Sequence, residues 1–182
     1  MDIFKGIRPL DYVLTAVMVA LAVLIGLENV YATADVSHAL DSHSALMIPV
    51  FAIAALPILW RRRNILAVIG VSFLVTAASV PMFGWVTRCG WALPLSMAMA
   101  YAVARFAGST QNQVVGLVGI FAFQVVTLVK DSATGGLGAL VVSVPAAALF
   151  YGIGRSVQTR AEKLTSTDPR QHVAQAPLGA SS

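Results

Sequence analysis

The residues best suited to chemistry in this sequence lie in one short polar stretch. Asp35, His38, Asp41 and His43 can all coordinate a divalent metal such as zinc. One turn of helix would bring Asp35, His38 and Asp41 together. Their spacing matches no well-defined metal site, however, and we interpret the stretch as a polar loop with solvated side chains. No metal or cofactor is therefore predicted.

Other chemical motifs fail on inspection. Cys89 is the single cysteine, which excludes an intramolecular disulfide and any multi-cysteine zinc or iron–sulfur site. The sequence Gly135-Gly136-Leu137-Gly138 lacks the lysine and the spacing of a phosphate-binding loop. Serine, histidine and acidic residues occur, but they form no nucleophile elbow. The sequence therefore predicts a protein that is not an enzyme.

The composition indicates a membrane protein. Hydrophobic residues make up 58% of the 182 positions and charged residues 11%, and the mean hydropathy is +0.80. A soluble domain carries about 25% charged residues. The net charge of +4 comes from basic residues scattered at the ends of apolar runs, as membrane anchoring requires. The expected partner of this chain is thus the lipid bilayer, and no nucleic acid is expected.

Six apolar runs reach or approach the roughly 20 residues that cross a bilayer. They are Leu10–Leu27, Ala45–Trp60, Asn64–Phe83, Gly90–Ala107, Gln113–Val129 and Leu137–Gly154. Short connections make successive helices antiparallel neighbours. The predicted fold class is all-α, a polytopic bundle of six transmembrane helices with short loops. The second run is the shortest, and the alternative is a re-entrant segment that would invert everything after it.

An arginine triplet between the second and third runs sets the predicted orientation. Arg61, Arg62 and Arg63 cannot lie in hydrocarbon, so they must form a turn at a membrane surface, and the positive-inside rule favours the cytoplasmic one. With six spans and both termini inside, only Arg88 and Lys130 face outward. The cytoplasmic set is then Lys5, Arg8, Arg61, Arg62, Arg63, Arg105, Arg155, Arg160, Lys163 and Arg170. We expect a multi-pass protein of the plasma (cytoplasmic) membrane, with Arg61–Arg63, Arg105 and Arg155 as topology anchors.

This orientation divides the chain into four parts. Residues 1–9 are predicted to form a cytoplasmic N-terminal segment and residues 10–154 the six-helix transmembrane domain. Residues 155–164 continue the sixth helix into the cytoplasm. Thr165–Pro169 then breaks this helix, and residues 165–182 are expected to form a disordered tail.

Two features within the runs predict contacts between helices. Small residues recur every four positions in the fourth run and should let a neighbouring backbone approach closely. This stripe comprises Ala92, Ser96, Ala100, Ala104 and Gly108. A place inside the bundle is the favoured interpretation, and a homodimer interface is the alternative. Gln124 is the strongly polar amide deep in a span, where it should hydrogen-bond another helix or, alternatively, contact a ligand.

Three segments carry a resemblance to a known family. They are Ala55-Leu56-Pro57-Ile58-Leu59-Trp60-Arg61-Arg62-Arg63, Tyr101-Ala102-Val103-Ala104-Arg105 and Gly154-Arg155-Ser156-Val157-Gln158-Thr159-Arg160. Together they resemble the N-terminal membrane-embedded sensor region of actinobacterial two-component histidine kinases, over most of residues 8 to 164. One departure is Asn64-Ile65, where that family often has proline after the arginines.

The resemblance implies signal perception, followed by a kinase core that this sequence does not contain. His172, within Arg170-Gln171-His172-Val173-Ala174, lacks the acidic residue that follows a phosphoacceptor histidine in that family. We expect no autokinase activity from this chain. It would be a freestanding input module, a truncated kinase or the separately encoded partner of a kinase or other cytoplasmic signalling protein.

The alternative function is a small membrane transporter or an accessory subunit of an exporter. Such a protein needs a polar path between its helices. The residues available for it are Ser72, Thr76, Ser96, Gln124 and Ser143. No chain of carboxylates lies at mid-membrane depth, which weakens a proton-coupled mechanism.

Overall fold

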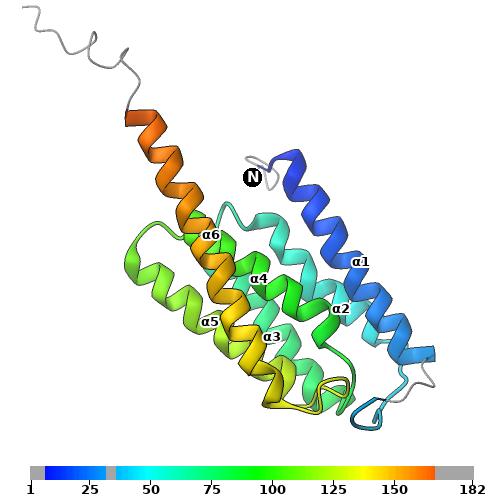
Figure 1. Cartoon of the computed structure of the whole chain (residues 1–182). Coiled ribbons are helices and arrows are strands. Elements are labelled where there is room, and N and C mark those ends of the chain that lie inside the picture. Colours follow the sequence, from blue (N-terminus) through cyan, green and yellow to red (C-terminus); the bar gives the residue numbers. More distant parts are fainter. Residues whose placement is uncertain (1–6, 32–35, 167–182) are drawn as a thin grey trace, which may run out of the picture.

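A computed structural model describes residues 7–31 and 36–166 and shows a bundle of helices (Figure 1). The helices are α1 (Pro9–Tyr31), α2 (Met47–Ala55), α3 (Ile65–Phe83), α4 (Cys89–Phe106), α5 (Thr110–Leu128) and α6 (Leu140–Ser166). There are also two 3₁₀ helices in the described residues. The first, η1 (Leu56–Trp60), precedes the turn to α3, and the second, η2 (Leu137–Ala139), precedes α6. The described ranges contain no strand, only an isolated bridge between Val86 and Asp131. The predicted all-helical class is confirmed.

The helical segments run alternately between two ends of the bundle (Figure 1). At one end, the start of α1 meets the turn after η1, since Arg61 hydrogen-bonds Asp11. At the other end, Asn29 of α1 exchanges hydrogen bonds with Thr87 before α4. We call these the arginine end and the loop end. The helix α4 lies in the centre and packs against α1, α3, α5 and α6.

Four helices are long and apolar enough to cross a membrane: α1, α3, α5 and α6. Their outward side chains are apolar and exposed, as with Val141 at 79% and Val118 at 63%. Such a surface suits hydrocarbon, and it identifies a helical bundle of the membrane-protein kind. The central α4 is not among the four. It is rich in small and partly polar residues, which a position between other helices allows.

The helices begin and end at residues with a clear local reason. Asn64 Oδ1 accepts a hydrogen bond from the Ala67 amide and caps α3, and Ser109 Oγ accepts one from the Asn112 amide and caps α5. Gly84 follows α3 with φ of +65°, a conformation that suits glycine. These residues fix where the connections turn, and hence how the helices alternate.

The second run forms two pieces instead of one regular helix. Pro57 has no amide hydrogen to continue the α-helical ladder, and the chain tightens there from α2 into η1. Met47–Trp60 is shorter than the four long helices, as the sequence predicted, yet it extends from the loop end to the arginine end.

The small-residue stripe of α4 lies inside the bundle, on the side that α6 covers. Ala92, Ser96 and Ala100 are fully buried and Ala104 is 3% exposed. Opposite them on α6, a Cβ added to Gly154 would lie 2.7 Å from Ala104 Cβ. The stripe ends there. Gly108, its last predicted member, lies beyond the end of α4, is exposed, and reverses the chain with φ of +71°.

The close approach of α4 and α6 can be tested at two neighbouring glycines. A Cβ at Gly154 would also meet the Tyr101 carbonyl oxygen at 2.8 Å, whereas a Cβ at Gly152 would meet nothing within 4 Å. We expect Gly154→Ala to destabilise the protein by about 1–3 kcal/mol through overpacking. Gly152→Ala should not lower the melting temperature in detergent micelles. Equal melting temperatures for the two variants would contradict this packing.

Candidate functional site: the arginine end and the loop end

The centre of the arginine end is a fully buried carboxylate. Asp11 Oδ1 accepts hydrogen bonds from Arg61 Nη2 at 2.7 Å and Nε at 3.0 Å, and Asp11 Oδ2 accepts one from Arg62 Nε at 2.7 Å. The Arg8 amide donates to the same carboxylate. Two consecutive arginines of the turn thereby hold the first turn of α1. The third, Arg63, has no side-chain hydrogen bond or ion pair within the described residues.

Contacts with an aromatic ring connect Arg62 to a further arginine, Arg105, at the end of α4. The Arg62 guanidinium lies 4.9 Å from the centre of the Phe106 ring, and that of Arg105 lies 5.7 Å from the same ring. Arg105 Nη1 donates to the Tyr101 hydroxyl at 3.2 Å, while its buried Nε has no hydrogen-bond partner in the described structure. The arginine end thus collects more positive than negative charge.

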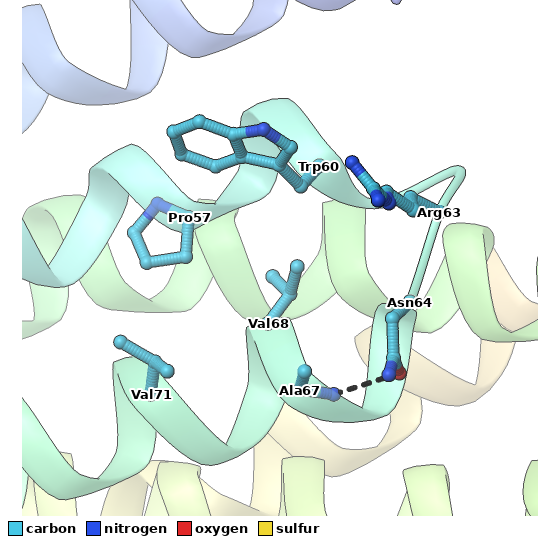
Figure 2. A pocket seen from close by; sticks show the side chains of 7 residues that line it. All are labelled: Pro57, Trp60, Arg63, Asn64, Ala67, Val68 and Val71. Atoms are coloured by element: carbon cyan, nitrogen blue, oxygen red, sulfur yellow. Dashed lines mark hydrogen bonds between the residues drawn. The ribbon is translucent and has the colours of Figure 1, made fainter. Parts of the chain in front are cut away.

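A shallow groove of about 340 Å³ lies beside the arginine turn (Figure 2). Pro57 and Trp60 of η1 form one wall, Ala67, Val68 and Val71 of α3 form the other, and Arg63 and Asn64 close it at the turn. The Asn64 side chain points to the Ala67 amide that it caps (Figure 2). Because its only charged member lies at the rim, this groove suits apolar chains better than polar reactants.

A second groove, of about 430 Å³, lies between α1, α4 and α6. Its lining is aliphatic and aromatic except for Arg61. The residues are Leu14, Met18, Arg61, Pro94, Met97, Ala98, Tyr101, Phe150 and Ile153. The groove holds no pair of catalytic side chains.

The loop end contains a buried cation that the sequence did not reveal. Arg88, predicted to face outward, is fully buried in the connection between α3 and α4. Its guanidinium donates to the carbonyl oxygens of Lys130, Ser79 and Gly84 at 2.8–3.1 Å, and to Ser79 Oγ. Burial lowers the pKa of Arg88 to about 10, against the opposing charge of Asp131, so it stays protonated at neutral pH.

Asp131 organises the loop end through backbone hydrogen bonds, and its charge acts on the Arg88 guanidinium without forming an ion pair with it. Its Oδ2 accepts hydrogen bonds from the amides of Arg88 and Cys89 at 2.7 Å, and its Oδ1 accepts from the Thr134 amide and hydroxyl. The carboxylate therefore stabilises the start of α4. No sequence pattern pointed to Asp131, because a lone acid beside Lys130 resembles any solvated loop.

The predicted metal-ligand candidates hold loops together. His38 stacks on Trp85 with ring centres 3.9 Å apart, and Asp41 Oδ2 accepts a hydrogen bond from the Trp85 amide. The His43 ring nitrogen Nδ1 lies 2.8 Å from the Asn29 carbonyl oxygen. Asp35 lies outside the described residues. Within the described part of the chain, no three histidine, cysteine or acidic side chains gather in a way that could hold a metal.

Gln124 connects three helices. Its side-chain amide donates to Ser96 Oγ of α4 at 3.0 Å and to the Ser143 carbonyl oxygen of α6 at 3.1 Å. The hydrogen bond between helices predicted from the sequence is present, and it joins α5 to both neighbours.

No family model, curated protein or solved structure matches this chain. The resemblance to histidine-kinase sensor regions thus gains nothing from these comparisons.

The buried carboxylate at the arginine end gives a direct test of the interactions there. Asp11→Asn would leave Arg61 and Arg62 without a counter-charge, and we expect it to reduce the free energy of unfolding by on the order of 3 kcal/mol. Arg63→Gln is the matched control and should change it by less than about 0.5 kcal/mol. Denaturant unfolding in micelles measures both. Similar effects from the two substitutions would show that the ion pairs of Asp11 with Arg61 and Arg62 do not hold α1.

The loop-end histidines predict a negative result. Because His38 and His43 contact Trp85 and Asn29 separately, zinc should leave the melting temperature in detergent unchanged. A zinc-dependent rise that disappears in the double variant His38→Ala/His43→Ala would contradict this and restore the metal hypothesis.

Proposed function

We propose that this protein is a six-span input module of the cytoplasmic membrane, with both termini in the cytoplasm. It transmits the state of its bundle to a cytoplasmic partner and has no kinase activity of its own. The resemblance to actinobacterial histidine-kinase sensor regions makes a separately encoded kinase the expected partner. The paired arginines at one end of the bundle support the orientation, since the positive-inside rule puts them on the cytoplasmic side.

The observation that carries this proposal is the length of α6. It runs without a break from Leu140 to Ser166 and extends beyond the other helices at the arginine end (Figure 1). Its last turns expose polar side chains, including Arg160 and a Gln158–Glu162 pair joined by a hydrogen bond of 2.9 Å. A polar helix that continues without a break out of an apolar bundle is suited to contact a soluble protein.

The same helix is tightly joined to the bundle. Its contact with α4 at Gly154 leaves no space for a methyl group, and Gln124 bonds its backbone at Ser143. A shift or rotation of α4 must therefore displace α6, and packed helices change between discrete arrangements instead of deforming continuously. This coupling supports α6 as the output element.

The transporter alternative has less support. Its candidate polar residues are buried, but most of them bond to neighbouring helices, as Ser72 does to the Ala54 carbonyl oxygen. In the described structure, the hydroxyls of Thr76 and Ser143 are the members of that set without a partner. The side chains of Ser72, Ser96 and Gln124 are thus occupied by contacts between helices, which favours packing over a path for a solute.

The output role can be tested by site-specific photocrosslinking in native membranes. A benzoylphenylalanine at position Thr159, exposed on the projecting part of α6, should capture a histidine kinase or another cytoplasmic signalling protein. The matched control carries the same group at Val141, which is 79% exposed near the loop end of the same helix and should meet lipid. Adducts are identified by mass spectrometry.

Only one pattern supports the proposal: signalling-protein adducts at Thr159 that are absent at Val141. If repeated experiments capture no signalling protein at Thr159, the input-module function is contradicted. Capture of transport ATPase subunits there would also contradict it and would favour the exporter alternative.

A further inference from the structure

The groove between α1, α4 and α6 is apolar along its length and has positive charge at one end. Both α1 and α6 pack on α4, so α4 forms the floor and the other two helices form the walls. Leu14 and Met18 come from α1, and Phe150 and Ile153 from α6. From Pro94 to Tyr101 the floor extends about 10 Å along α4, at 1.5 Å per residue. This length is about two thirds of the roughly 15 Å that one leaflet contributes to the hydrocarbon core.

The charge lies where α4 approaches the arginine end. Arg61 lines the groove directly, and Arg105 lies behind its lining, where it donates a hydrogen bond to the hydroxyl of the lining residue Tyr101. Asp11 is the acidic group that contacts this cluster, and both of its oxygens are already occupied by Arg61 and Arg62. Arg105 has no acidic partner in the described residues, and its buried Nε is unbonded.

We propose that this groove binds an anionic phospholipid, with one acyl chain along α4 and the phosphate beside Arg105 and Arg61. Apolar walls accept the chain. The three guanidiniums of Arg61, Arg62 and Arg105 face the single carboxylate of Asp11, and this excess of positive charge selects an anionic headgroup. Basic pockets between helices at a cytoplasmic surface bind anionic lipid headgroups in this manner. The inference rests on the bundle being a membrane domain and does not depend on the signalling function.

A lipid bound in this groove should stabilise the contact between α6 and α4. Phe150 and Ile153 lie four residues and one residue before Gly154, where α6 touches α4. A chain lying against them stabilises that arrangement of α6 because it binds the folded bundle and not the unfolded chain. An anionic lipid should therefore raise the melting temperature more than a neutral one.

The test compares phosphatidylglycerol with phosphatidylcholine of identical chains, each added to delipidated protein in detergent. At concentrations well above its dissociation constant, phosphatidylglycerol should raise the melting temperature by about 5 °C and phosphatidylcholine by much less. Native mass spectrometry should show retained phosphatidylglycerol. Inorganic phosphate alone should have no effect, since it lacks the chain that fills the groove.

Two variants locate the site. Ala98→Phe places a ring in the groove and should abolish the phosphatidylglycerol effect, whereas Ala148→Phe, on an exposed face of α6 outside this groove, should retain it. Arg105→Gln should remove the preference between the headgroups without filling the groove. The site is wrong if both lipids act equally on the wild type, if Ala98→Phe and Arg105→Gln each keep the selective effect, or if phosphate alone reproduces it. Circular dichroism checks that Ala98→Phe is folded, and Arg105→Gln decides the matter if it is not.

Discussion

The buried Asp11 carboxylate and the arginine turn hold the first helix of the bundle in place. A carboxylate with no exposed surface requires compensating charge, and Arg61 and Arg62 supply it in three hydrogen bonds. The pair fixes α1 against the end of η1, so it sets the register of the short α2–η1 segment. Every later helix follows from that turn, because the connections are too short to change the order of neighbours.

At the loop end, hydrogen bonds to the backbone take the place of ion pairs between side chains. The buried guanidinium of Arg88 is stabilised there mainly by hydrogen bonds to carbonyl oxygens. Asp131 stabilises the start of α4 by accepting hydrogen bonds from two backbone amides. Between the ends, contacts depend on small residues and on Gln124, as expected where a surrounding apolar solvent gives helices no hydrophobic reason to associate. The result is a bundle with tight internal contacts and one helix, α6, that projects from it.

The sequence predicted the helical class and placed all six helical segments, since apolar runs bounded by polar residues leave few alternatives. It also predicted the polar contact of Gln124 with another helix. It did not predict which charges pair, because Asp11 and Arg61 are 50 positions apart and no local pattern connects them. The burial of Arg88 was missed for the same reason. Gly108 was assigned to a packing stripe, whereas its backbone conformation ends α4.

The cytoplasmic position proposed for the arginine turn can be tested through the accessibility of single cysteines. In a Cys89→Ser background, Ala39→Cys samples the loop end and Gln111→Cys the arginine end, both at exposed positions. If the turn is cytoplasmic, a membrane-impermeant maleimide should label Ala39→Cys in intact cells and label Gln111→Cys only after permeabilisation. Labelling of Gln111→Cys in intact cells, with Ala39→Cys protected, would contradict it.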